Sequence, residues 1–274
     1  MFLKSRGKHR ESGMALGIVV WFIAGMSLLV SGIVFQAKVD TKLAQIHYFK
    51  ARATAAGDGA INLALAEQIS LRESGQGGID RQRQYRVGQQ VVDVVMIPGD
   101  IFVNLNTATT AELIGVFSVA VNEANGNGES SRFDPRSLAD AVVNFRDGKG
   151  GGNSRRQSFY SPEDLLRVPG LSRSVYDGVR DLIVVTDIGA SGGPNWTVEE
   201  KLSALNAIGE GTGMALQGVV RQNTSFLRID AKVSIGDKSW LRRRWVSMGS
   251  GDSGLPWQFV RSEAVRALGE VRNS

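Results

Sequence analysis

The chain has 274 residues, of which 42% are hydrophobic and 22% charged, a balance typical of a folded protein. It contains no cysteine, which excludes disulfide bonds, thiolate metal sites and cysteine nucleophiles. The net charge of +5 comes partly from basic residues among the first ten positions, so the rest of the chain is close to neutral. Bulk charge therefore gives no argument for a nucleic-acid partner.

An apolar segment without any charged residue runs from Met14 to Phe35. A helix of this length measures about 33 Å, enough to cross a hydrocarbon core of about 30 Å. Because four basic residues precede it, the positive-inside rule predicts a single-pass protein with a cytoplasmic N-terminus and its body outside. The segment is longer than the apolar region of a cleaved secretory signal, and no A-x-A site follows it. A membrane anchor is favoured, and a simple anchor without further role stays open.

The start of this segment has a sharp boundary, because polar residues end at Ser12-Gly13 and the apolar run begins at Met14. This junction resembles the class III leader of type IV prepilins and pseudopilins, which a membrane-embedded peptidase cleaves after the glycine. The resemblance implies a leader over residues 1–13, cleavage between Gly13 and Met14, and methylation of the new N-terminus.

Most such proteins have glutamate at the fifth position of the processed chain, where this sequence has Ile18. That carboxylate can neutralise the N-terminal amine of a neighbouring subunit within the bilayer, where an unpaired charge is costly. A subunit without it is a poor repeating unit but can still cap an assembly. Ile18 is therefore interpreted as a replacement compatible with a position at a pilus tip.

The helix is expected to continue beyond the membrane over residues 36–73, which contain no proline and many alanines. Apolar and small residues recur there in three- and four-residue steps and form one stripe. We expect the second half of this stripe to pack on the chain's own globular domain. Gly57 and Gly59 weaken the helix by roughly 1 kcal/mol each relative to alanine. The stripe consists of Val39, Leu43, Ile46, Ala53, Ala56, Ala60 and Leu63.

Strands are expected on both sides of a long middle section. The valine-rich segment from Tyr85 to Ile97 predicts one strand, ended by a turn at Pro98-Gly99-Asp100. Leu227 to Ile235 alternates between apolar and polar residues, which predicts a strand with one buried and one wet face. A turn at Asp237 precedes a second strand from Trp240 to Met248. A third is expected over Pro256 to Arg261.

The middle section, roughly residues 105–218, is expected to be helical. It opens with the string Val103-Asn104-Leu105-Asn106-Thr107-Ala108, after which Thr107 or Thr109 can cap a helix beginning at Ala111. Further along, Ser161-Pro162-Glu163-Asp164 is typical of a helix start, with a serine cap and acids in the first turn. A tight turn containing Pro169-Gly170 leads into a helix predicted over Arg173 to Leu182.

The strings NLNTA and SPEDLLRVPGLS resemble the SAM-like or helix-hairpin-helix module of general secretion pathway protein K (GspK), the large minor pseudopilin of type II secretion systems. The C-terminal FLRIDAKVSI and the arginine-rich strand after it also fit that family. The resemblance is carried here by Asn104, Asn106, Thr107, Pro169 and Gly170, and is thinner between Gly189 and Gln222.

The resemblance implies an α+β fold, in which a long N-terminal transmembrane helix packs on a small antiparallel sheet that carries an inserted SAM-like helical domain. The implied parts are a leader (1–13), a transmembrane helix (14–35), its periplasmic extension (36–73), a sheet region (74–103 and 219–274) and the insertion (104–218).

The implied role is that of a minor pseudopilin at the tip of the pseudopilus, where it initiates or limits assembly for protein export. The protein would lie in the bacterial inner membrane with its body in the periplasm. The implied partners are other minor pseudopilins, the prepilin peptidase and a secreted substrate.

Members of this family bind calcium through clustered acids and polar oxygens. Asp140, Asp147 and Asn153 lie in a suitable region, but the sequence shows no dense acidic cluster. These three residues are calcium candidates rather than a predicted site, and no other cofactor is expected.

Two alternatives remain. Competence-type DNA receptors are also membrane-anchored and carry a similar hairpin, which holds phosphate through backbone N–H groups and nearby arginines. Acidic residues are interleaved with the arginines here, which is typical of solvated helix faces, so no nucleic acid is expected. A minor subunit of a related type IV pilus is the second alternative. The arginines concerned are Arg155, Arg156, Arg167, Arg173 and Arg180.

The sequence gives no case for an enzyme. Its only histidines are His9 in the leader and His47 on the extended helix, and no G-x-S-x-G motif is present. The arginine run 242–244 between two tryptophans could be a nucleic-acid patch. On a strand, Arg243 faces away from its two neighbours, which favours an edge or solvent-facing strand kept soluble by charge.

Overall fold

The computed structural model describes residues 12–74, 82–125, 133–149, 157–186, 197, 199–201, 203–204, 226–249 and 255–268. The chain divides into two compact units, residues 1–52 and residues 53–274.

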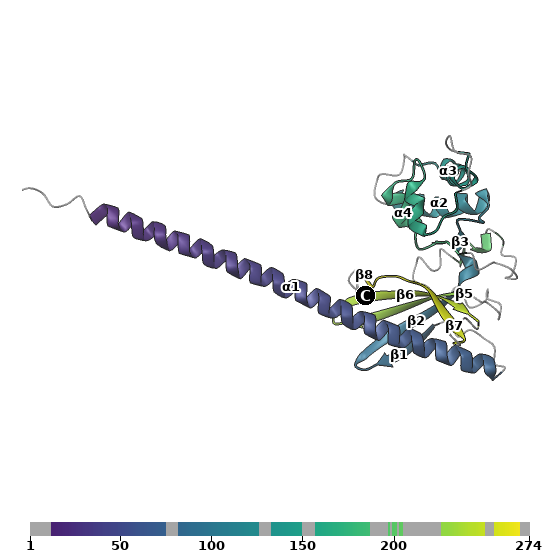
Figure 1. Ribbon diagram of the computed structural model, residues 1–274, viewed down its shortest axis with the longest axis horizontal. Helices are drawn as coiled ribbons and strands as arrows, with labels where there is room; N and C mark the ends of the chain where they lie inside the picture. The colour runs from purple at the N-terminus through teal and green to yellow at the C-terminus, as the bar shows by residue number, and fades with distance from the viewer. Residues whose placement is uncertain are drawn as a thin grey trace, which may run out of the picture. The chain divides into compact units, whose positions relative to one another are not determined.

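One helix, α1 (Ser12–Glu73), contains 62 residues and confirms the predicted continuation beyond the apolar segment Met14 to Phe35 (Figure 1). In the first unit its large apolar side chains are exposed from Leu16 to Ile46. In the part of the chain that the structure describes, α1 alone is long and apolar enough to cross a membrane.

The second unit is built around a six-stranded antiparallel sheet in the order β1-β2-β5-β6-β7, with β8 also pairing with β6. The antiparallel sheet expected from the sequence is thus confirmed, and the whole arrangement is α+β. The strands are β1 (Gln82–Val87), β2 (Gln90–Pro98), β5 (Phe226–Ile235), β6 (Lys238–Met248), β7 (Trp257–Ser262) and β8 (Arg266–Leu268).

The prediction of one strand from Tyr85 to Ile97 is wrong, because this segment forms the hairpin of β1 and β2. Gly88 begins the turn with φ of +60°, a conformation that glycine adopts without steric cost. The turn of the β5–β6 hairpin likewise contains a glycine with positive φ, Gly236 at +64°. There the predicted turn at Asp237 is confirmed, and Ile235 pairs with Lys238.

The C-terminal part of α1 lies against one face of the sheet (Figure 1). Ala53, Ala56 and Ala60 are buried as predicted, whereas Leu63 is half exposed, contrary to expectation. Gly57 marks the closest approach of helix and sheet, since a Cβ atom there would lie 2.6 Å from Cβ of Arg242. The glycine that weakens the helix therefore permits its close packing on β6.

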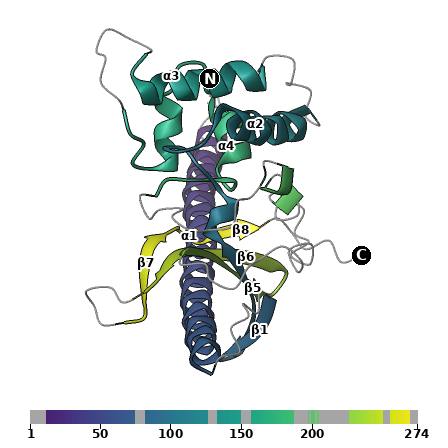
Figure 2. The same cartoon turned by 90° about the vertical axis from the view of Figure 1, so that its right-hand side faces the viewer.

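A second group of elements, residues 99–225, is inserted between β2 and β5, and we call it the helical insertion. Because Pro98 lies opposite Leu227 on these paired strands, the chain leaves and re-enters the sheet at neighbouring points. Figure 2 shows α2, α3 and α4 grouped together. The described elements are η1 (Gly99–Ile101), β3 (Val103–Asn104), α2 (Thr110–Asn125), α3 (Pro135–Asp147), η3 (Pro162–Arg167), α4 (Arg173–Val179) and β4 (Ile183–Val184).

Two helix predictions in the insertion need correction. The segment after Ser161 is a 3₁₀ helix rather than an α-helix, and it ends before Val168 because a residue preceding proline disfavours the helical conformation. The helix predicted to reach Leu182 ends at Val179, after which the chain turns into β4. Strand β4 pairs with β3 in parallel.

Apolar side chains of the insertion form one buried core, which extends onto the sheet at Ile97, Phe226 and Trp245. Trp245 stacks on Phe226 at 5.4 Å and meets the edge of Phe102 at 4.9 Å between ring centroids. A Cβ atom on Gly99 would overlap the ring of Phe226. One face of the sheet therefore packs on the insertion, while α1 packs on the other.

Candidate functional site

The N-terminal part of α1 contains the residues predicted for processing. Gly13 and Met14 lie in the first turn of α1, and their side chains are outside the described part of the structure. The side chain of Ile18 is 68% exposed. Their roles in cleavage and tip placement stay predictions, because nothing in the geometry tests them.

The helix and the sheet are joined by partly buried charges where α1 contacts β6. Asp58 accepts from Nε of Arg242 at 2.7 Å and pairs with Nη2 of Arg244 at 2.8 Å. The guanidinium of Arg244 also lies over the ring of Phe259, 4.3 Å from its centroid. These two arginines hold α1 on the sheet.

The interpretation of β6 as an edge or solvent-facing strand is therefore wrong. The strand has β5 on one side and β7 and β8 on the other, and its arginines are buried or nearly so on both faces. The predicted alternation is correct: Arg242 and Arg244 face α1, whereas Arg243 faces the insertion.

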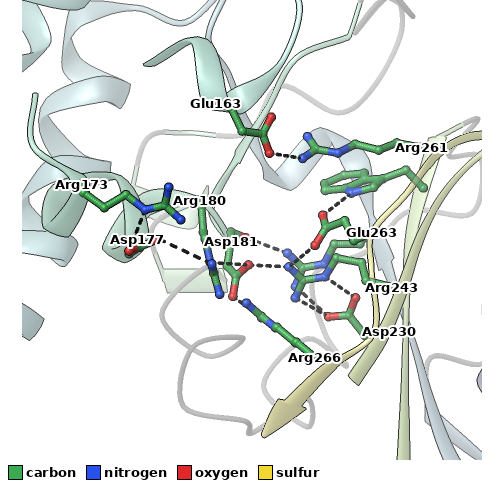
Figure 3. Close-up of polar contacts among 12 residues, drawn as sticks. Glu163, Arg173, Asp177, Arg180, Asp181, Asp230, Arg243, Arg261, Glu263 and Arg266 are labelled. Carbon is green, nitrogen blue, oxygen red and sulfur yellow. Dashed lines mark hydrogen bonds and ion pairs between the residues drawn. The ribbon is translucent and has the colours of Figure 1, made fainter. Parts of the chain in front are cut away.

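Arg243 is only 4% exposed and forms a fork with Asp230, which lies directly opposite on β5. Its Nε donates to Oδ1 of Asp230 at 2.7 Å, and its Nη2 donates to Oδ2 at 3.0 Å (Figure 3). Burial alone would lower the pKa of Arg243, but Asp230 and the neighbouring acids outweigh it and raise that pKa. The opposite charges likewise hold the pKa of Asp230 below its usual value despite burial.

Arg228 is fully buried, and its guanidinium lies 4.4 Å from the ring centroid of Phe102. Its Nη1 donates to the backbone oxygen of Asp181 at 2.6 Å, and its Nη2 lies 3.1 Å from Oδ2 of Asp230. Burial lowers its pKa to about 10, against the raising influence of Asp230. The prediction that this face of β5 is wet fails at Arg228 and Asp230, because the insertion covers it there.

Asp181 belongs to the turn between α4 and β4, and arginines from the sheet converge on it (Figure 3). Arg243 donates from Nη1 at 2.5 Å, and Arg266 on β8 donates from Nη2 at 2.6 Å. Burial would raise the pKa of Asp181, but these two arginines hold it well below the usual range.

Glu263 completes the group from the segment between β7 and β8. It accepts from Nε1 of Trp245 at 3.2 Å and lies 3.7 Å from Nη1 of Arg243. Three arginines of the sheet thus face three carboxylates, and Arg180 of the insertion lies 4.0 Å from Oδ1 of Asp181. We call this set the junction cluster: Asp181, Arg228, Asp230, Arg243, Glu263 and Arg266.

The NLNTA motif fixes the backbone of the insertion. Asn104 donates from Nδ2 to the backbone oxygen of Thr186 at 2.8 Å. Asn106 binds both backbone groups of Phe159, donating to its oxygen at 2.9 Å and accepting from its nitrogen at 2.8 Å. Thr107 is exposed, and the helix cap predicted for Thr107 or Thr109 is made by Thr109. The two asparagines therefore connect segments that lie far apart in the sequence.

The hairpin residues Pro169 and Gly170 are exposed, and Gly170 has φ of +86°. Three arginines considered for phosphate contact lie near acids: Arg167 with Asp164, and Arg173 and Arg180 with Asp177. The other two, Arg155 and Arg156, lie outside the described residues. This mixed-charge surface is the one that the sequence indicated.

The calcium candidates occupy α3 and the segment after it. Asp140 is exposed on α3, Asp147 lies 3.5 Å from Nε of Arg146, and Asn153 is outside the described residues. Within the ranges described above, no three histidine, cysteine, aspartate or glutamate residues are grouped to hold a metal ion.

The junction cluster was missed by the sequence analysis, although one signal for it was available. A two-residue turn at Gly236-Asp237 sets the β5–β6 register, which places Asp230 opposite Arg243. Opposite charges directly across two strands predict a pair. The contribution of Asp181 has no such signal, because it comes from a distant segment.

No protein-family profile matches the chain, and no curated protein sequence matches it. Among solved structures, it is similar to a chain in the crystal structure of the GspK-GspI-GspJ complex from the type 2 secretion system of enterotoxigenic Escherichia coli. That likeness covers 83% of this chain and 98% of the other, with 13% sequence identity and a TM-score of 0.40.

Proposed function

We propose that this chain is a GspK-like minor pseudopilin of a type II secretion system. The proposal rests on three features that occur together in α1. A polar leader changes to an apolar run at Gly13–Met14, the helix continues unbroken to Glu73, and its last part packs on an antiparallel sheet. A simple membrane anchor needs neither the abrupt junction nor a helix that continues into the core of the soluble domain.

The proposed work is assembly rather than catalysis. The exposed apolar part of α1 would pack among the helices of other minor pseudopilins as it leaves the inner membrane. Ile18, where most such subunits have glutamate, supports a place at the tip, because a tip subunit has no later subunit's amine to neutralise. The helical insertion, with its SAM-like sequence motifs, would occupy the periplasmic end and face the secreted substrate or the outer-membrane channel.

Processing of the leader tests this proposal. Gly13→Leu should leave the precursor uncut when the full chain is expressed with a prepilin peptidase. Gly17→Leu is the matched control, because it adds the same side chain to the same apolar helix and a Cβ atom there contacts nothing within 4 Å. Normal cleavage of the Gly13 variant would contradict the proposal.

A DNA-binding assay tests the competing receptor hypothesis. The detergent-solubilised full chain should bind no DNA at low salt, where phosphate contacts are strongest. The full chain is needed because residues 53–65 of α1 belong to the core of the soluble unit. Binding that weakens steeply with added salt would favour the DNA receptor.

A further inference from the structure

The helical insertion is connected to the sheet by two neighbouring backbone segments, and these connections alone would allow it to rotate relative to the sheet. The backbone passes from Pro98 to Gly99 on the way out and returns at Phe226. These positions lie side by side, because β2 and β5 are neighbouring strands. Two adjacent connections define an axis about which an inserted domain can swing.

Apolar contacts lie close to these connections. The ring of Phe226 occupies the position that a Cβ atom on Gly99 would take. Trp245 contacts both Phe226 and Phe102. These apolar contacts fill the space next to the two connections. To prevent the helical insertion from rotating relative to the sheet, directional contacts such as hydrogen bonds and ion pairs are also needed.

The junction cluster supplies these contacts at the turn between α4 and β4. Asp181 comes from the insertion, and its carboxylate accepts from Arg243 on β6 and Arg266 on β8. Arg228 on β5 donates to its backbone oxygen, and Arg180 of the insertion lies 4.0 Å from its Oδ1. The partners are themselves fixed, since Arg243 is held by the fork with Asp230. A carboxylate held by two guanidinium groups, one of them buried and fixed by a second carboxylate, has little freedom to move.

We infer that Asp181 locks the helical insertion to the sheet in one orientation, as the carboxylate on which arginines of the sheet converge. Glu163, on the same side of the insertion, adds a second and more exposed bond to Arg261 at 2.9 Å (Figure 3). The two parts move as one rigid body, so a load on the sheet reaches the insertion without bending at Pro98 and Phe226.

Asp177 provides a matched control for this inference. It lies one helical turn before Asp181 but pairs with Arg173 and Arg180, which belong to the insertion itself. Asp177→Asn removes a carboxylate of the same size from the same segment without touching the sheet. Of these two variants, only Asp181→Asn removes ion pairs between the helical insertion and the sheet.

The test measures a distance between the sheet and the insertion. Because the chain has no cysteine, spin labels can be placed at the exposed positions Lys232 on β5 and Asp140 on α3 by Lys232→Cys and Asp140→Cys. Double electron–electron resonance on the full chain should give one narrow distance distribution for the native sequence and for Asp177→Asn. Asp181→Asn should lose the narrow distribution and give a broad one.

Two results would overturn the inference: a broad distribution for the native sequence, or a narrow, unshifted one for Asp181→Asn. If Asp181→Asn does not fold, Arg266→Gln replaces it, since Arg266 is half-buried and reaches Asp181 from β8. That variant should broaden the distribution, with unchanged far-ultraviolet circular dichroism. An unbroadened distribution for it would count against the lock.

Discussion

Arg243 on β6 and Asp230 on β5 face each other across a hairpin and form two parallel hydrogen bonds, at 2.7 and 3.0 Å. The pair lies beneath the helical insertion, with the side chain of Arg243 only 5% exposed and that of Asp230 14%. This position makes it a structural element rather than a surface ion pair.

Replacing Arg243 with leucine should lower the free energy of unfolding by about 3–5 kcal/mol, because it leaves the carboxylate of Asp230 without its partner in a buried site. It also removes one of the ion pairs of Asp181, which is partly exposed. Urea denaturation followed by tryptophan fluorescence measures this loss. Arg173→Leu is the control, since Arg173 is exposed and forms one pair within its helix. Its loss should stay within about 1 kcal/mol. Equal losses would mean that the buried pair is not structural.

Gly57→Ala should lower the free energy of unfolding by about 1–3 kcal/mol, because the new methyl group would press on Cβ of Arg242, which cannot move without its strand. Gly59→Ala is the comparison. Its methyl group would lie 3.1 Å from a terminal carbon of Val87, and alanine favours the helix by roughly 1 kcal/mol. Thermal denaturation of both variants should rank Gly57→Ala as clearly less stable. The opposite order would show that α1 does not pack on β6 through Gly57.

Asn106→Ala should cost about 1–3 kcal/mol of stability, because the backbone groups of Phe159 lose both of their partners. Hydrogen exchange should become faster at the amide of Phe159, which donates to Asn106. The exposed neighbour Thr107 serves as control, and Thr107→Ala should leave both stability and exchange close to native. If Asn106→Ala behaves like that control, the motif does not have the structural role described for it.

Acid should weaken the junction cluster. The pKa values of Asp181 and Asp230 are lower in the folded chain than their ordinary values, so their contribution to stability is complete above the unfolded pKa of about 3.9. It is lost as the pH falls from there toward the folded pKa values. The free energy of unfolding should therefore change little between pH 5 and 8 through these groups and fall below about pH 4.

Urea denaturation across this pH range measures the effect. In Asp181→Asn, the free energy of unfolding should fall less steeply at acidic pH than in the native sequence. An unchanged slope in that variant would show that Asp181 does not titrate with a lowered pKa.

The sequence predicted the fold where a pattern is local. The absence of proline predicted α1, the alternation of Leu227 to Ile235 predicted β5, and a turn at Asp237 predicted the β5–β6 hairpin. The hairpin at Gly88 was missed, because valines on both sides of the glycine form an apparently continuous strand.

The buried arginines could not be predicted in the same way. Alternation separates the two faces of β6 but does not say what covers each face. Arg243 is buried because the helical insertion, which begins over a hundred residues earlier, folds back over the sheet. A charged strand was therefore interpreted as solvent-facing, and the partner at Asp181 could come only from the tertiary structure.

The N-terminal residue of the mature protein tests the proposed function most directly. Intact-mass and N-terminal peptide analysis of the chain purified from membranes of a host with prepilin peptidase should find Met14, carrying an N-methyl group, as the first residue. A protein that begins beyond Phe35, or that keeps residues 1–13, would contradict the assignment to the pseudopilins.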